Sequence, residues 1–241
     1  MRLQEGYGAD GIRKMFEKVH RRYRLVNHLL TLGMDRFWRA RAAGMAAGAP
    51  AGRWLDICSG TGDMAARLKA AAPEGTAVYA LDFTMPMIRT ARKDRRLRDV
   101  RFVLGDARKL PFADRSFNLL TVSFSTRNMN LSEEVLLETF REFLRVLQPG
   151  GLFINLETSQ PSAAPVRKLF HLLVGAYVAP AGRLISGAGP AYRYLSQSIP
   201  RFYPPEKLQS MISGVGFTDV SYRPLTLGAV AVHRAVKPRP G

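Results

Sequence analysis

The chain has 241 residues but only one cysteine, Cys58. A single thiol excludes an internal disulfide and a thiolate-based zinc site, and it fits a reducing compartment. The first ten residues, MRLQEGYGAD, contain no apolar run of the signal-peptide type, so we expect a cytoplasmic protein. The longest apolar tract covers residues 169–181 and is interrupted by Gly175 and Pro180. It falls well short of the roughly twenty residues that cross a bilayer.

Acidic residues are also scarce. Asp and Glu number 19 against 36 Lys and Arg, so the net charge is +17. Folding does not require so large an imbalance, which favours an anionic partner. Basic residues gather in residues 13–24 and 89–98, and each one near an anionic leaflet contributes about 1 kcal/mol. We therefore expect peripheral association with the inner face of the membrane, with solvated helix faces as the alternative.

The segment WLDICSGTGD, residues 54–63, is the clearest indicator of function. Because an apolar strand runs here into a small-residue turn and then a helix, a ligand can contact bare backbone and the free N–H groups of the helix. A phosphate-binding P-loop needs Lys after its last glycine, whereas Gly62 is followed by Asp63. The turn therefore predicts a nucleoside-type cofactor other than ATP.

Two such cofactors remain. The turn satisfies the loose dinucleotide pattern GxGxxA, and Asp82 follows about twenty residues later, where such folds bind a ribose. Asp56 and Asp63 flank the turn with negative charge. Their charge favours a ligand with a sulfonium and an ammonium over one with a pyrophosphate. We therefore predict S-adenosylmethionine as the cofactor, with NAD as the alternative.

A third acid extends this pattern. Residues 100–104 read as a strand that ends in Gly-Asp-Ala, with Asp106 at the centre. Asp82 would then accept both ribose hydroxyls and Asp106 the adenine amine, at consecutive strand ends where open α/β sheets bind ligands. The alternative is that Gly60 and Gly62 are ordinary turn residues and that the acids are solvated.

Strand patterns and helical patterns alternate from residue 53 onward, which predicts an α/β fold with a doubly wound, mostly parallel sheet. The predicted strands are residues 53–58, 77–82, 101–104, 118–124 and 152–156, and the predicted helices between them are residues 64–72, 87–94 and 133–147. A closing hairpin is predicted from residues 219–223 and 229–235.

A helical cap and a helical insertion are predicted outside this core. Residues 11–32 have apolar positions at helical spacing and a basic opposite face, so we expect one amphipathic helix over the active site, followed by a hinge at residues 44–52. Residues 163–189 are predicted to be mostly helical. The resulting single domain has four parts, which are the cap 1–50, the cofactor-binding core 53–157, the insertion 158–200 and the C-terminal part of the sheet 201–241.

Longer motifs resemble known proteins. The core resembles class I methyltransferases that use S-adenosylmethionine through LDICSGTGD, Asp82, GDARKLPFADRSFN and the turn RVLQPGG, which implies a seven-stranded Rossmann-like sheet. Nearly the whole chain is similar to the ubiquinone and menaquinone biosynthesis C-methyltransferase family through YRLVNHLLTLGMDRFW, VSFSTRN, YRYLSQSI and LTLGAVAVHRA. It departs from the family near the N-terminus, where Tyr-Asp-x-Met-Asn is replaced by YRLVN, residues 23–27.

The resemblance implies methylation of a ring carbon on a polyprenylated quinol, most directly demethylmenaquinol to menaquinol. The alternatives are a ubiquinone-pathway benzoquinol, another small molecule and, more distantly, RNA. We expect no nucleic-acid partner, because the fourth strand is followed by Phe124-Ser125-Thr126 rather than by a Pro-Pro-aromatic motif; a homodimer remains open. The residues expected to contact the cofactor are Asp56, Gly60, Thr61, Gly62, Asp82, Phe83, Asp106, Ala107 and Ser123.

Carbon methylation of a quinol requires a phenolate whose negative charge spreads onto the ring carbon. Neither a metal nor a covalent intermediate is needed. We predict that Arg127, with Asn128, stabilises the phenolate oxygen; the alternative is that Arg127 pairs with Glu157 or Asp114. Tyr23 is predicted to shape or hydrogen-bond the quinol ring, with simple packing as the alternative.

Other candidates have weaker support. Tyr192 and Tyr194 are secondary candidates for contacting the ring, and His233 is expected to be structural because it lies in an apolar strand pattern. The remaining histidines lack ligand spacing, so no metal site is expected. Residues 169–181, together with the N-terminal helix, are predicted to form an apolar path for the prenyl tail, and a buried core helix is the alternative.

Overall fold

The computed structural model describes residues 8–20, 23–186 and 189–240. Within them the chain forms one seven-stranded sheet in the order β3-β2-β1-β4-β5-β7-β6. The first five strands are parallel, and β7 runs antiparallel to both β5 and β6. The strands are β1 (Arg53–Ile57), β2 (Ala77–Asp82), β3 (Arg101–Leu104), β4 (Phe117–Ser123), β5 (Leu147–Thr158), β6 (Thr218–Leu225) and β7 (Val230–Val236).

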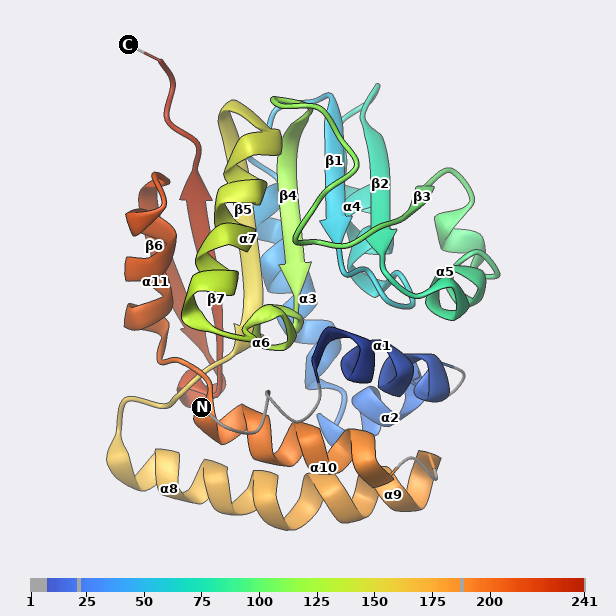
Figure 1. Ribbon diagram of the computed structural model, residues 1–241, viewed down its shortest axis with the longest axis vertical. Helices are drawn as coiled ribbons and strands as arrows, with labels where there is room; N and C mark the ends of the chain where they lie inside the picture. The colour runs from blue at the N-terminus through green and yellow to red at the C-terminus, as the bar shows by residue number, and fades with distance from the viewer. Residues whose placement is uncertain (1–7, 21–22, 187–188, 241) are drawn as a thin grey trace.

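Helices cover both faces of the sheet (Figure 1). Because strand residues alternate between faces, Trp54 packs in the layer of α3 and α4, whereas its neighbour Leu55 packs in the layer of α7 and α11. The helices of these layers and their connections are α3 (Met34–Ala46), α4 (Asp63–Ala71), α5 (Met85–Ala91), η1 (Arg95–Leu97), α6 (Thr126–Met129), α7 (Glu133–Val146), α11 (Pro205–Gly214) and η4 (Thr226–Gly228).

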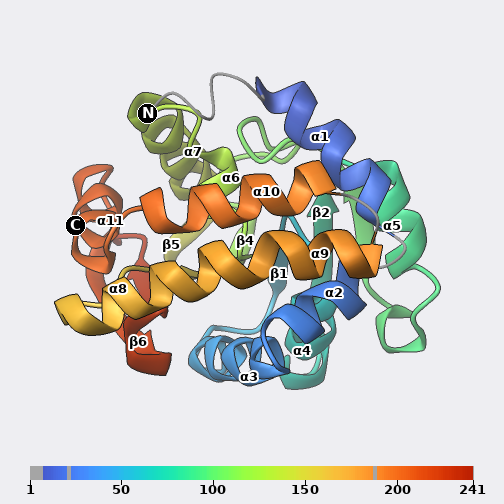
Figure 2. The ribbon, with the colours of Figure 1, turned by 90° about the horizontal axis from the view of Figure 1, so that it is seen from below.

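A further group of helices lies beneath the carboxyl ends of β1, β2 and β4 (Figures 1 and 2). Chain segments that are distant in sequence meet here, because the N-terminal helices pack against helices from the insertion after β5. The helices of this underside are α1 (Gly8–Val19), α2 (Tyr23–Leu30), α8 (Ala164–Leu173), the π-helical η2 (Val174–Val178), α9 (Ala179–Ser186), α10 (Gly189–Ser198) and η3 (Ile199–Arg201).

The sheet and the mostly helical insertion are confirmed, but the cap differs from its prediction. One helix was predicted over residues 11–32, whereas α1 ends at Val19 and α2 begins at Tyr23. The predicted hinge begins inside a helix, because α3 continues to Ala46 through an alanine-rich stretch of high helix propensity. The predicted turn at residues 149–151 lies within β5, where the pairing with β4 shifts register. Residues 1–7, 21, 22, 187, 188 and 241 of the cap, insertion and C-terminal part lie outside the described residues.

Candidate cofactor and acceptor site

The two turn glycines after β1 have different reasons to be glycine. Both adopt positive φ, +55° at Gly60 and +80° at Gly62, which side chains disfavour. The Gly60 amide donates a hydrogen bond to Asp82 Oδ2 at 2.8 Å, so this residue joins the end of β1 to the end of β2. A Cβ on Gly62 would lie 2.4 Å from Leu97 Cδ1. Gly62 is therefore required for packing against η1, and Gly60 is the glycine that borders the ligand side.

Asp82 is already well supplied with hydrogen-bond donors. Its carboxylate is 4% exposed and accepts bonds from the Gly60 amide at 2.8 Å, the Thr84 amide at 2.9 Å and Thr84 Oγ1 at 2.8 Å. Burial nevertheless raises the pKa of Asp82, with these bonds opposing the rise. A carboxylate offers about four acceptor sites, and besides these three donors the Phe83 amide also stabilises its charged form. The predicted pair of ribose hydroxyls would therefore compete with these donors for the carboxylate.

A small cavity lies at these strand ends, and we call it the cofactor cavity. Its volume is about 80 Å³, below the roughly 300 Å³ at which ligand pockets usually begin. A nucleoside-sized ligand therefore needs more room than the cavity offers as it stands, and the α1 side chains Ile12 and Phe16 form part of its wall. The cofactor cavity is lined by Ile12, Phe16, Tyr23, Cys58, Gly60, Asp82, Phe83, Met87, Asp106, Ala107, Arg108, Ser125, Asn128, Met129 and Leu131.

Seven of the twelve predicted site residues meet in this cavity, and the rest lie elsewhere. Those in its lining are Tyr23, Gly60, Asp82, Phe83, Asp106, Ala107 and Asn128. Among the described residues, the structure does not bring Asp56, Gly62 or Ser123 into a cavity lining, and it places Thr61 and Arg127 in the linings of two other cavities.

Asp56 lies behind the turn rather than beside a ligand. It is 1% exposed, and its Oδ1 accepts a hydrogen bond from Thr121 Oγ1 on β4 at 2.8 Å. Burial raises its pKa to about 7, with the Thr121 bond opposing the rise. Asp56 is therefore about half protonated at neutral pH.

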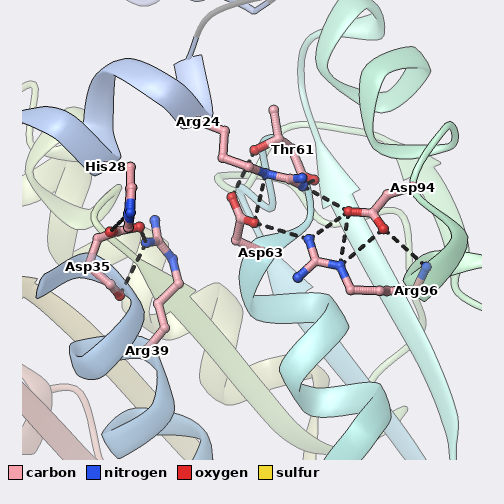
Figure 3. Close-up of polar contacts among 8 residues, drawn as sticks. All are labelled: Arg24, His28, Asp35, Arg39, Thr61, Asp63, Asp94 and Arg96. Atoms are coloured by element: carbon pink, nitrogen blue, oxygen red, sulfur yellow. Dashed lines mark hydrogen bonds and ion pairs between the residues drawn. The ribbon is translucent and has the colours of Figure 1, made fainter. Parts of the chain in front are cut away.

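Asp63 also fails to present free negative charge to the turn (Figure 3). It lies 2.9 Å from Arg24 Nε and 3.6 Å from Arg96 Nη2, and it accepts a hydrogen bond from Thr61 Oγ1 at 3.0 Å. The two acids therefore present less negative charge to the turn than the sequence suggests. Burial raises the pKa of Asp56 to about 7, and Asp63 is paired with two arginines.

Asp106 is held by a close neighbour. Arg108 donates to both carboxylate oxygens, from Nε to Oδ1 at 3.1 Å and from Nη2 to Oδ2 at 2.6 Å. Partial burial opposes the effect, but the Arg108 bonds hold the pKa of Asp106 below its usual value. Asp106 is therefore charged, and an adenine amine would share it with Arg108.

A second, more apolar cavity adjoins the first, and we call it the acceptor cavity. It has a volume of about 190 Å³ and extends between α1, α2, η2 and α10. Phe16, Tyr23 and Asn128 line both cavities. A methyl donor in one cavity and an acceptor in the other would therefore meet beside Tyr23 and Asn128.

Arg127 brings a buried cation to the acceptor cavity. It is 3% exposed, and its Nη1 donates to Ser198 Oγ at 2.7 Å and to Asn128 Oδ1 at 3.4 Å. Glu157 accepts the Arg127 backbone N–H at 3.0 Å, and Asp114 is paired with Arg145 at 2.7 Å. The predicted alternative of pairing with Asp114 is therefore wrong.

Of the secondary candidates, the two tyrosines line a cavity and the histidine is buried in the sheet. Tyr192 and Tyr194 both line the acceptor cavity, and the Tyr194 hydroxyl donates to Asn128 Oδ1 at 3.4 Å. His233 is buried on β7, its Nε2 lies 3.0 Å from the Pro205 carbonyl oxygen, and burial lowers its pKa. The structural role expected of His233 is confirmed.

Sequence reasoning missed several apolar lining residues. Phe16 was not singled out, because helical periodicity does not distinguish a core face from a cavity wall. Cys58 was considered only as a thiol, but it lines the cofactor cavity. Trp38 and Phe124, whose ring centroids lie 5.9 Å apart, line the acceptor cavity; both stand in motifs of the family resemblance but were given no role.

The acids of the cavity lining fit a nucleoside cofactor, because Asp82 and Asp106 present carboxylate oxygens to its hydroxyl and amine donors. The buried hydroxyls of Ser59 and Ser123 have no hydrogen-bond partner within the described ranges, but neither residue lines the cofactor cavity. A mostly parallel sheet with a glycine turn, acids at consecutive strand ends and an adjoining apolar cavity fits an enzyme of the Rossmann-like class that uses a nucleoside cofactor, as S-adenosylmethionine-dependent methyltransferases do.

Comparisons with known proteins agree. The model of the ubiE/COQ5 methyltransferase family matches residues 3–237. A demethylmenaquinone methyltransferase from Roseiflexus sp. (strain RS-1) is 40% identical over 230 residues, which are 95% of this chain and 94% of that protein. UbiE of Azotobacter vinelandii, a ubiquinone/menaquinone biosynthesis C-methyltransferase, is 37% identical over 241 residues, 98% of this chain and 93% of that protein.

The chain belongs to the ubiE/COQ5 methyltransferase family. The fold is also shared with a solved S-adenosylmethionine-dependent methyltransferase from Thermotoga maritima. The two have a TM-score of 0.65 at 19% identity, over 93% of this chain and 99% of that one. No helix in the described ranges is both long and apolar enough to span a bilayer.

Proposed function

We propose that this enzyme methylates a ring carbon of a polyprenylated quinol, and that demethylmenaquinol is converted to menaquinol. The observation that carries this proposal is the meeting of the cofactor cavity and the acceptor cavity at Tyr23 and Asn128. The printed names of the relatives, a demethylmenaquinone methyltransferase and a ubiquinone/menaquinone C-methyltransferase, support the same substrate class.

The chain's own residues would favour the reactive form of the quinol. S-adenosylmethionine, when bound, supplies an electrophilic methyl group on a sulfonium. Arg127 holds a buried positive charge beside the acceptor cavity, which stabilises a phenolate more strongly than an exposed arginine would. Asn128 accepts from Arg127 and so orients the guanidinium. The remaining acceleration comes from holding the ring carbon in line with the methyl group.

Tyr23 acts in this proposal as a hydrogen-bond donor rather than a base. Burial raises its pKa above the ordinary value of 10.0, with a hydrogen bond to Asn27 opposing the rise. The hydroxyl therefore keeps its proton at neutral pH. Tyr23 would donate to a ring oxygen. The edge of its ring also covers the cofactor turn, because a side chain on Gly60 would place its Cβ 3.8 Å from Tyr23 Cε1.

The prenyl tail needs an apolar exit, and the underside offers one. Phe170, Val174 and Val178 line the acceptor cavity, and no side chain of α8 is buried. Exposed leucines on the same segment include Leu172 at 67% and Leu173 at 56%. Soluble proteins seldom expose such an apolar face unless it contacts another apolar phase.

We therefore propose that the enzyme is cytoplasmic and docks on the inner face of the membrane through this underside. The apolar face consists of Leu25, Leu29, Leu32, Leu169, Leu172, Leu173, Tyr177 and Leu184, each at least 41% exposed. The net charge of +17 adds attraction to anionic lipid. A homodimer stays a prediction, which light scattering after gel filtration tests.

The substrate proposal is tested with purified enzyme, S-adenosylmethionine and detergent-dispersed quinols. Mass spectrometry of the extracted quinol should show one added methyl group on demethylmenaquinol. A parallel reaction with a ubiquinone-pathway benzoquinol distinguishes the main alternative, and one with RNA tests the distant one. Methylation of RNA, with both quinols left unchanged, would contradict the proposal.

A further inference from the structure

A third cavity lies between the cap and the start of the core, and we call it the basic cavity; it adjoins the acceptor cavity, because Asp35 and Arg39 line both. Its volume is about 830 Å³, within the range of roughly 300 to 1,000 Å³ that is usual for small-ligand sites. Its walls come from α2 and the start of α3 on one side, and from the start of α4, the end of α5 and η1 on the other. No step of the methyl transfer uses it.

The charge of this cavity is strongly unbalanced. Seven Lys and Arg side chains line it against three carboxylates, a surplus of four positive charges. A concave wall with charge of one sign focuses its field and attracts the opposite ion. The basic lining residues are Arg24, Arg36, Arg39, Arg67, Lys93, Arg95 and Arg96, and the acidic ones are Asp35, Asp63 and Asp94.

All three carboxylates are already paired with basic side chains (Figure 3). Asp94 pairs with Arg96 at 2.6 Å and with Arg24 at 3.1 Å, and Asp63 pairs with the same two arginines. Asp35 lies 2.9 Å from both His28 and Arg39. These ion pairs lie in the wall of the cavity. Because they neutralise its carboxylates, little negative charge remains to balance the other cations.

Four cations of the lining remain without such a partner. Arg36, Arg67, Lys93 and Arg95 enter no ion pair within 4.0 Å among the residues that the structure describes. They come from α3, from α4, from the segment between α5 and η1, and from η1 itself, so they surround the cavity rather than follow one helix. Such converging donors are suited to a phosphate group.

The rim of the basic cavity identifies the source of that phosphate. Leu25 is 53% exposed and lines the cavity itself, and Leu32, in the turn after the same helix, is 84% exposed. The helix α2 lies beside the insertion, where the Tyr177 hydroxyl donates to the Leu29 carbonyl at 3.4 Å (Figure 2). The basic cavity and the apolar face defined above are therefore continuous on one side of the molecule.

We infer that the basic cavity binds the phosphate headgroup of an anionic phospholipid whose acyl chains lie against the apolar face. A soluble phosphate or a nucleic acid would have no use for the exposed leucines at the rim. The inference rests on the proposed docking at the membrane and adds to it a defined headgroup site. This site would fix the orientation of the enzyme, so that the acceptor cavity faces the bilayer.

Vesicle sedimentation tests the inference with two charge-matched variants. The cavity variant is Lys93→Gln with Arg95→Gln, and the control is Arg141→Gln with Arg223→Gln, two exposed residues on α7 and β6. Both variants lose two positive charges at exposed positions, and thermal melts confirm that each is folded. Vesicles of phosphatidylcholine are compared with vesicles that contain about one third phosphatidylglycerol, at about 0.15 M salt.

The wild-type protein should prefer the anionic vesicles. The cavity variant should bind them about thirtyfold more weakly, which is the worth of two basic residues at an anionic surface, and the control should lose less than about threefold. Turnover of a short-chain, water-soluble quinol should be the same in all three proteins, because neither pair of residues belongs to the methyl-transfer site.

Each other outcome overturns the inference in a recognisable way. Equal losses in the two variants, or no loss in either, mean that attraction to lipid is diffuse and that no headgroup site exists, although docking itself survives. Failure of the wild-type protein to bind either vesicle removes docking and the headgroup site together, and leaves the methylation proposal to its own assay. Binding of an RNA oligonucleotide that depends on Lys93 and Arg95, without such dependence for vesicles, assigns the cavity to nucleic acid instead.

Discussion

The predicted role of Asp82 in holding the cofactor ribose can be tested by replacing it with alanine. Its carboxylate already accepts bonds from Gly60 and Thr84, so we expect it to gain one hydrogen bond from a ribose hydroxyl. A hydrogen bond to a charged group contributes about 1.5 to 3 kcal/mol. At about 1.4 kcal/mol per tenfold change, the dissociation constant for the cofactor should rise by about ten- to a hundredfold.

Calorimetry with S-adenosylhomocysteine measures this change directly. Thr84→Val is the matched control, because it removes the Thr84 Oγ1 donor to Asp82 while leaving the carboxylate in place, and its dissociation constant should change less than about threefold. Thermal melts separate binding from folding, since Asp82→Ala also leaves the Gly60 amide without its acceptor.

Two results would refute this reasoning. An unchanged dissociation constant in a folded Asp82→Ala protein would mean that the ribose is not held by this carboxylate. Equal losses in Asp82→Ala and Thr84→Val would mean that the geometry of the turn, rather than a hydrogen bond to the ligand, determines affinity.

Three further predictions concern catalysis, pH dependence and packing. Arg127→Ala should lower kcat by about 10²- to 10³-fold with little change in cofactor affinity, as removal of a charge-stabilising donor does; equal losses in both, measured by steady-state kinetics and calorimetry, would contradict its role. Burial raises the pKa of Asp56 to about 7. Between about pH 4 and 7 the folded protein therefore holds a proton that the unfolded chain releases. As a result, the free energy of unfolding falls by about 4 kcal/mol as the pH rises through that window. Asp56→Asn should remove this fall in denaturant titrations, and a slope identical to that of the wild type would disprove it. Gly62→Ala should destabilise the protein by about 1 to 3 kcal/mol more than Gly75→Ala, because both have positive φ but only the first meets a neighbour, Leu97; equal melting temperatures would count against the packing argument.

Much of the fold could be predicted because its signals are local. The strand and helix periods around residues 53–156 depend on neighbouring residues only, and the observed strands β1 to β4 begin and end within one residue of their predicted bounds. The cap was less predictable, because α1 and α2 are short amphipathic helices with different packing partners: α1 packs against α5 and α10, and α2 against α3 and α9. Sequence periodicity carries no information about such partners.

The candidate site, like the fold, was predictable only where its sequence signals are local. Gly60, Asp82 and Asp106 were predicted because each occupies the end of a strand, and topology brings strand ends together. The charge state of the acids was not predictable, because it depends on burial and on distant partners. Arg24, which neutralises Asp63, comes from a helix almost forty positions away in the chain, and no local pattern connects the two.

The start of α2 explains why the cap carries so much of the site. Tyr23 lines the cofactor and acceptor cavities, and the next residue, Arg24, donates to the Thr61 carbonyl at 3.0 Å and lines the basic cavity. Leu25 then extends to the exposed rim, and Val26 is fully buried. Consecutive residues of one helical turn thus contact the reacting centre, the glycine turn and the surface proposed to meet lipid. A shift of α2 caused by docking would alter the Tyr23 and Thr61 contacts together, and by linkage a bound cofactor would alter docking to the same extent.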